Sequence, residues 1–290
     1  MRIGAGMVGQ HHSHGSNINN GGHKVGYITN TKVIKKKRYI RRVKRRVPPL
    51  PIALQELFDA CRDIFKGPGT VPPPEDVQRL SRILDNMKPE DVGLSEELQF
   101  FKTKNGVKGV PRVTYTTICK CDNFSLCIFF LPSGGVIPLH NHPGMTVFNK
   151  LLLGSMHIKS YDWADPIDSS NASSAPSHLR LANVKADGIL TAPCNSSVLY
   201  PTTGGNIHAF TARTPSAILD VIGPPYSKED GRDCSYYKEF PYSAFSSGET
   251  CPGIEDGKSY GWLEEIDMPE NSQMDGIEYL GPQVMETSSC

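Results

Sequence analysis

The chain has 290 residues, of which 38% are hydrophobic, and its formal net charge is +1. This size suits a globular protein with a substantial core, and no apolar run reaches the roughly 20 residues that cross a bilayer. The N-terminus lacks the apolar region of a signal peptide, and the eight cysteines lack C-x-x-C spacing. We therefore predict an intracellular protein with reduced thiols and no membrane contact.

The first 47 residues differ in charge from the rest of the chain. Residues 1–46 contain no acidic residue, and the segment 32–46, KVIKKKRYIRRVKRR, is strongly basic. Such a run is typical of a nuclear-localisation signal, of an arm that binds nucleic acid, or of a solvated charge cluster. Because the remainder carries all 30 Asp and Glu residues, we expect it to bind no nucleic acid directly. Residues 1–47 are predicted to be a disordered leader.

Two helix patterns follow the leader, and many short strand patterns follow the helices. Residues 52–67 and 72–91 repeat apolar side chains at three- and four-residue steps, which predicts two packing helices. From about residue 111, runs rich in β-branched and aromatic residues alternate with Gly, Pro, Asn and Asp, which predicts a sandwich or barrel. A jelly roll is the expected architecture. The predicted strands are residues 112–120, 125–132, 145–154, 155–163, 180–187, 197–201, 207–212 and 216–223.

The segment PLHNHPGM places His140 and His142 one residue apart. In an extended strand both imidazoles leave the same face, so they form either half of a metal site or a pair of buried polar side chains. The spacing resembles the first motif of the cupin family, with Gly134 and Gly154 at the glycine positions. Val147 stands where that motif has a glutamate. The resemblance implies a mainly β fold, the cupin double-stranded β-helix or jelly roll, with N-terminal packing helices.

A third histidine completes the candidate metal site. His208 follows a Gly-Gly pair in PTTGGNIHAF and fits the second, weaker cupin motif. Three neutral imidazoles without a carboxylate leave the charge of a divalent metal uncompensated, which favours an anionic substrate such as a thiolate. Together with PLHNHPGMTVF, GGNIHAFTA and LDVIGPPY, the chain over residues 50–265 resembles the plant cysteine oxidases and, more distantly, the animal cysteamine dioxygenases. His157 and His178 do not fit the ligand pattern.

The resemblance implies an enzyme that uses O2 and iron(II), with His140, His142 and His208 as ligands. Its substrates would be ethylene-response transcription factors, whose N-terminal cysteine becomes cysteine sulfinic acid, two steps up the thiolate oxidation ladder. The product would mark those proteins for arginylation and degradation in the N-degron pathway, as a response to hypoxia. We expect a monomer in the nucleus and cytoplasm. The competing hypotheses are a dioxygenase of a free small thiol, cysteine or cysteamine, and a non-catalytic metal-binding cupin.

Three further residues are candidates for the site. Asp220 interrupts the apolar strand AILDVIG, so it faces either water or a polar cavity, where it would orient a ligand histidine or bind the substrate ammonium. The resemblance favours a role for Asp220 in activity and implies that Tyr226 and Cys234 lie near the iron, although both could be ordinary loop residues. Some thiol dioxygenases cross-link such a pair. We predict a catalytic domain over residues 48–265 and a flexible acidic tail over residues 266–290.

Overall fold

The computed structural model describes residues 52–102, 112–164, 176–245 and 259–285. The predicted leader with its basic run therefore lies outside the described residues. The described residues belong to one compact unit. None of the helices in the described ranges is both long enough and apolar enough to cross a membrane.

Both predicted helices and all the predicted strands are present, and β3, β10, β11 and β12 add to the predicted set. The elements in chain order are α1 (Ile52–Ile64), α2 (Pro74–Asn86), η1 (Pro89–Val92), α3 (Gln99–Lys102), β1 (Thr114–Lys120), β2 (Ser125–Leu131), β3 (Val136–His140), β4 (Thr146–Leu153), β5 (Ser155–Trp163), β6 (Leu179–Thr191), β7 (Ser197–Leu199), β8 (Ile207–Ala212), β9 (Ser216–Gly223), β10 (Tyr236–Pro241), η3 (Tyr242–Ala244), β11 (Tyr260–Ile266), η4 (Glu270–Ser272) and β12 (Asp275–Gly276).

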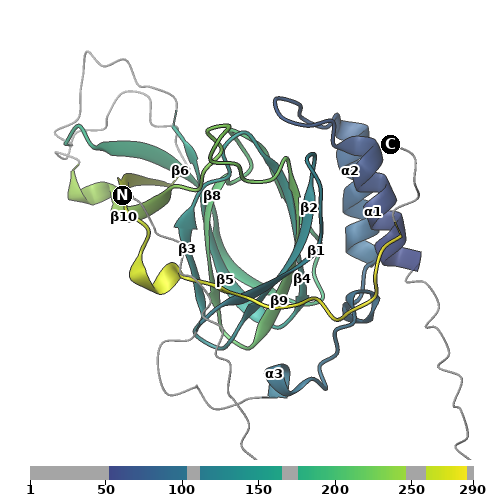
Figure 1. The fold of residues 1–290 in the computed structure, drawn as a ribbon. Helices are drawn as coiled ribbons and strands as arrows, with labels where there is room; N and C mark the ends of the chain where they lie inside the picture. The colour runs from purple at the N-terminus through teal and green to yellow at the C-terminus, as the bar shows by residue number, and fades with distance from the viewer. Residues whose placement is uncertain (1–51, 103–111, 165–175, 246–258, 286–290) are drawn as a thin grey trace, which may run out of the picture. The chain divides into compact units, whose positions relative to one another are not determined.

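The strands form two sheets whose inner faces meet. One sheet has the order β12-β1-β2-β9-β4-β7, and the other closes into a ring in the order β10-β11-β6-β5-β8-β3. The ring closes where Tyr236 of β10 pairs with His140 of β3. Side chains of both sheets pack between them, for example Leu151 and Ile218 against Phe210. The predicted mainly β jelly roll with N-terminal packing helices is confirmed (Figure 1).

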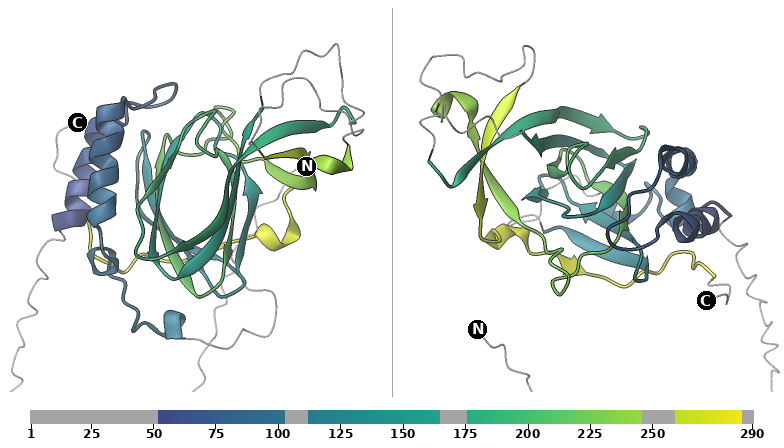
Figure 2. Two further views of the ribbon diagram at one scale, coloured as in Figure 1. Left: turned by 180° about the vertical axis from the view of Figure 1, so that it is seen from behind. Right: turned by 90° about the horizontal axis from the view of Figure 1, so that it is seen from above.

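The two helices cover the outer face of the first sheet, as two further views show (Figure 2). Their buried residues, including Leu57 of α1 and Leu84 of α2, form one apolar cluster with Phe148 of β4. Two residues further along β4, the Nζ atom of Lys150 donates to the carbonyl of Asp85 at 3.2 Å, near the end of α2. The helices therefore support the first sheet from outside and leave its inner face to the functional site.

The segment that follows β11 runs along the domain and does not form a separate tail. β12 pairs in parallel with β1, and the hydroxyl of Tyr279 donates to the carbonyl of Val92. The backbone N–H of Met285 donates to the side chain of Gln55 in α1 at 2.8 Å. The prediction of a flexible tail over residues 266–290 is therefore wrong for residues 266–285. Figure 1 shows this yellow segment reaching the helices.

Candidate metal centre

Three histidines, two from neighbouring strands of the ring and one just after a strand, meet at one point. His140 ends β3 and lies opposite His208 of β8 in the antiparallel pairing, and His142 follows two residues after His140. The centroids of the three rings are 4.8 to 4.9 Å apart. In the described part of the chain, these side chains are the only group of three or more His, Cys, Asp or Glu residues placed to hold a metal ion. His157 and His178 lie outside the group and pair with acidic side chains, as expected of residues that are not ligands.

The hydrogen bonds of two histidines fix which ring nitrogen faces the centre. The Nδ1 atom of His140 lies 2.8 Å from the carbonyl oxygen of Pro138. Since a carbonyl only accepts, Nδ1 carries the proton and Nε2 keeps its lone pair. The hydroxyl of Tyr226 donates to the carbonyl of Asn141, and its oxygen lies 2.8 Å from Nδ1 of His142. His142 therefore donates from Nδ1 and also presents an unprotonated Nε2.

The three side chains fit a divalent metal ion. The Nε2 atoms of His142 and His208 are 3.1 Å apart, and two imidazole nitrogens bound at right angles to one metal, each at about 2.1 Å, would be about 3.0 Å apart. Burial lowers the pKa of all three histidines, and the nearby histidines lower the pKa of His142 and His208 further. The rings are therefore neutral at neutral pH, which is the form that binds metal.

The position of the cupin glutamate is apolar in this chain. Val147 is fully buried and packs with Met145, Leu199 and Ile222 against the ring of Tyr226. Among the described residues, no carboxylate joins the three imidazoles as a fourth ligand. The protein thus offers nitrogen ligands alone, and a metal held here would keep its full positive charge.

Two buried polar residues that the sequence analysis does not single out hold the histidine segments together. The backbone N–H of His142 donates to Oδ1 of Asn206 at 3.1 Å, and Nδ2 of Asn206 donates back to the carbonyl of His142 at 2.9 Å. The carboxylate of Asp162 in β5 accepts the backbone N–H groups of Gly204, Gly205 and Asn206 at 2.9, 2.8 and 3.0 Å. Asp162 thereby fixes the turn that leads into His208.

Asp220 of β9 lies in the interior and is only 7% exposed, so the solvent-facing alternative is wrong. Nδ2 of Asn149 in β4 donates to its carboxylate at 2.7 Å. The observed partner of Asp220 is thus an asparagine and not a ligand histidine. Burial raises the pKa of Asp220 to about 7, against the opposing effect of the Asn149 hydrogen bond. Its carboxyl group is therefore partly protonated at neutral pH.

Tyr226 and Cys234 lie together on the loop between β9 and β10. Besides its contact with His142, the phenol of Tyr226 interacts with the thiol of Cys234, which also lies beside Tyr236. Burial raises the pKa of the Cys234 thiol to about 11, so this thiol is protonated at neutral pH and is a weak nucleophile. The structure thus connects Cys234 to the centre through Tyr226.

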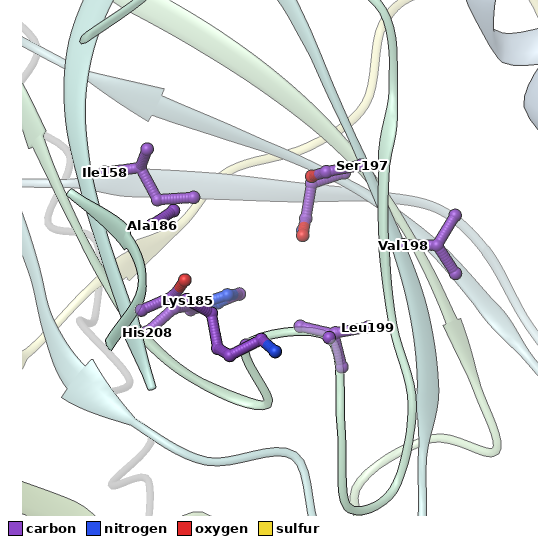
Figure 3. A pocket seen from close by; sticks show the side chains of 11 residues that line it. Ile158, Lys185, Ala186, Ser197, Val198, Leu199 and His208 are labelled. Atoms are coloured by element: carbon purple, nitrogen blue, oxygen red, sulfur yellow. The ribbon is translucent and has the colours of Figure 1, made fainter. Parts of the chain in front are cut away.

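A cavity of about 190 Å³ opens beside the third histidine. His208 and Lys185 lie on one side of it, and Ser197 and Leu199 lie across from them (Figure 3). Asn149, the partner of Asp220, also lines this cavity. The cavity gives a small molecule or a chain end access to His208, one of the three imidazoles.

The model of the PCO_ADO family matches residues 83–284. The chain belongs to this family. The matched region of this PCO_ADO member includes the histidine triad, and it also includes Asp220, Tyr226 and Cys234. Asn206, Asp162 and Lys185 lie within it as well.

Curated relatives of this PCO_ADO family member are similar over most of their length. The chain is 48% identical to plant cysteine oxidase 1 of Arabidopsis thaliana over 240 residues, 80% of each chain. It is 46% identical to plant cysteine oxidase 2 of the same plant over 264 residues, covering 90% of this chain and 92% of the relative. It is 30% identical to human 2-aminoethanethiol dioxygenase over 244 residues, covering 77% and 87%.

Among solved structures, the chain is similar to an RmlC-like cupin protein from Desulfovibrio desulfuricans. The sequence identity is 18% and the TM-score is 0.27, and the match covers 43% of this chain and 97% of the cupin.

Proposed function

We propose that this chain is an iron-dependent thiol dioxygenase that oxidises the N-terminal cysteine of a protein to cysteine sulfinic acid. One thiolate and one O2 give one sulfinate, so both oxygen atoms end on a sulfur that loses four electrons. The observation that carries the proposal is the centre of three neutral imidazoles, which no carboxylate joins as a ligand in the described ranges. The identity to the two Arabidopsis plant cysteine oxidases supports the same activity.

His140, His142 and His208 would hold the iron, each through Nε2. Iron, when bound, would supply open coordination positions and let electrons pass from the thiolate to O2. Because Val147 replaces the carboxylate, the substrate sulfur provides the missing negative charge. An N-terminal cysteine has a free amine two carbons from its sulfur, and an internal cysteine has none, so a centre that engages both groups selects a chain end.

Asp220 acts on the substrate through Asn149. Since Nδ2 of Asn149 donates to Asp220, its amide oxygen remains available as an acceptor. Asn149 lines the cavity, where that oxygen would accept a hydrogen bond from the amine of the substrate. Asp220 is therefore a positioning residue in this proposal.

Tyr226 holds His142 in the tautomer that binds metal. Its hydroxyl donates to the carbonyl of Asn141 and accepts from Nδ1 of His142, which fixes the ring orientation and raises the basicity of Nε2. Cys234 interacts with the same hydroxyl, so it would act on the centre indirectly, through Tyr226.

The experiment that tests this function compares three peptides with the iron-loaded protein in air. A Cys-initiated peptide should gain two oxygen atoms, measured by mass spectrometry. Its N-acetylated twin and a peptide with an internal cysteine should not react, because neither offers the free amine. Oxidation of the acetylated peptide at a comparable rate would disprove amine-dependent recognition. Faster turnover of free cysteine than of the peptide would favour a small-thiol dioxygenase.

We further propose that the substrates are ethylene-response transcription factors, oxidised after removal of their initiator methionine, and that the enzyme acts as a monomer. Their sulfinylated N-terminus would enter the N-degron pathway and connect their lifetime to hypoxia. The likeness to plant cysteine oxidases supports this role. In plants that lack this gene, such a factor should accumulate at normal oxygen. Measuring its level there checks this role.

A nuclear and cytoplasmic location is proposed from the basic run of residues 32–46, which lies outside the described residues. Neutralising Lys35, Lys36, Lys37 and Arg38 should move the protein toward the cytoplasm without changing turnover in vitro. An unchanged distribution would favour a solvated charge cluster, and loss of DNA retention would favour a nucleic-acid arm.

A further inference from the structure

Among the described residues that line the cavity beside His208, one carries a formal charge. This is Lys185 of β6, and its side chain is about half exposed. In Figure 3 its amine lies between His208 and Leu199. A flexible ammonium is thus part of the cavity that reaches His208, one of the three imidazoles.

An irregularity in the sheet turns Lys185 toward the cavity. In the antiparallel pairing of β5 with β6, Ser160 lies opposite Ala186 and Tyr161 lies opposite Val184, so Lys185 is an extra, unpaired residue. Successive side chains of a regular strand point to opposite faces, yet Lys185 and Ala186 both line the cavity. Such β-bulges redirect a side chain and occur often beside active sites.

The ammonium of Lys185 keeps its hydrogen-bonding capacity. Its ion-pair partner among the described residues is Asp162, and the closest atoms are 3.8 Å apart, which is longer than a hydrogen bond. Asp162 already accepts three backbone N–H groups from the turn that leads to His208. Lys185 therefore has donors to offer to a bound molecule.

The walls near Lys185 suit a main chain better than large side chains. Gly204 and Gly205 have φ of +83° and +84°, and a Cβ atom on Gly205 would lie 2.6 Å from the hydroxyl of Ser160. No larger residue fits at Gly205 without a shift of its neighbours, so no side chain projects into the cavity from this position. Ala186 and Ser197 add two more small side chains to the lining.

We propose that Lys185 binds the main-chain carbonyl oxygen of the substrate's N-terminal cysteine. The cavity would thereby distinguish a peptide from a small amino-thiol. This specificity role rests on the proposed function. Every peptide that begins with cysteine has this carbonyl group. 2-Aminoethanethiol carries the same sulfur and amine but lacks the carbonyl. A lysine there contributes affinity for the peptide alone.

The test measures binding without turnover, by anaerobic calorimetric titration of the iron-loaded protein with a Cys-Gly-Gly-Gly amide and with 2-aminoethanethiol. Lys185→Met keeps the length of the side chain and removes its donors, Lys185→Arg keeps the charge and donors, and Lys238→Met removes an exposed lysine of β10 outside the cavity. Lys185→Met should raise the Kd for the peptide about tenfold more than the Kd for 2-aminoethanethiol, the scale of a hydrogen bond from a charged donor. Lys185→Arg should restore most of the difference, and Lys238→Met should match the wild type.

Equal weakening of both ligands by Lys185→Met, or no weakening of either, would overturn the proposal. An effect confined to peptides with Asp or Glu after the cysteine would also overturn it, because Lys185 would then read a side-chain charge. Turnover in air separates this result from the proposed function. If the wild type binds the peptide through Lys185 but oxidises no thiol, the specificity role stands and the dioxygenase activity fails.

Discussion

The two faces of β4 are both buried, but one packs against the helices and the other contacts the residues around the metal centre. Phe148 and Lys150 face the helices, where Phe148 packs edge-on against Phe65 at 6.5 Å and Lys150 donates to two backbone carbonyls. Val147 and Asn149 face the interior, beside Tyr226 and Asp220. The outer face is an ordinary core in which the buried charge has neutral acceptors. The inner face contacts Asp220 of the adjacent strand β9, a carboxyl group whose pKa burial raises to about 7, and such a shift is typical of a functional site.

The largest effect on activity is expected at the three histidines of the ring, which the inner face of the first sheet meets. Replacing His140, His142 or His208 with Ala should remove iron and turnover together while the fold remains, because each ring supplies one of three ligands. Metal analysis, turnover and circular dichroism measure the three properties. Stoichiometric iron in a variant that lacks two of the histidines would contradict the ligand assignment.

The outer face should control stability and not chemistry. Phe148→Ala removes a fully buried ring and should cost about 3–5 kcal/mol of unfolding free energy, the usual range for such a cavity. Urea denaturation measures the loss. Turnover per folded, iron-loaded molecule should stay near the wild-type value, and a tenfold fall at unchanged iron content would show that the two faces are not separate.

The raised pKa of Asp220 predicts a pH-dependent difference in stability. The carboxyl group titrates near 3.8 in the unfolded chain and near 7 in the folded one, so the folded state binds the proton more tightly. Its contribution to stability is complete below about pH 4 and is lost as the pH rises through 7. The total change is at most about 4 kcal/mol.

This difference is measured on the metal-free protein by denaturation at pH 5 and pH 8. Asp220→Asn stays neutral throughout, so its stability relative to the wild type should rise between these two values. The same relative stability at both would show that Asp220 has an ordinary pKa.

Asp220 and Asn149 should act as one unit in catalysis. Asp220→Asn should lower turnover about tenfold with iron still bound, the scale for residues that support a metal site. Asn149→Ala should have a similar effect, and the double variant should be no worse than either single one, because one change removes the charge of the acceptor and the other removes the donor of the same interaction. Additive losses would separate the two residues, and wild-type turnover in Asp220→Asn would remove Asp220 from the mechanism.

Tyr226 should give the smallest effect of this series. Tyr226→Phe removes the hydroxyl that accepts from His142 but leaves the ring that packs on Val147. Turnover and iron affinity should fall by less than they do in the Asp220 variant. If neither quantity changes, Tyr226 does not position His142.

The sequence predicted the histidine triad because its signals are local: one residue separates His140 from His142, and a Gly-Gly pair precedes His208. The partners of those histidines depend on contacts between distant segments, and no pattern reveals them. Asp162 bonds a turn 42 residues later, Asn206 bonds His142 across 64 residues, and Asn149 meets Asp220 across 71. The segment 266–285 has no periodicity, yet its backbone pairs with β1. The bulge at Lys185 likewise follows from strand pairing alone.

The most direct test of the central claim is a reaction of the iron-loaded protein with a Cys-initiated peptide under isotopically labelled O2, followed by mass spectrometry. A thiol dioxygenase with a three-histidine centre should place two labelled oxygen atoms on the N-terminal sulfur, and the His208→Ala variant should place none. A product with one labelled oxygen and one from water, or a peptide that stays unmodified while iron is bound, would contradict the account.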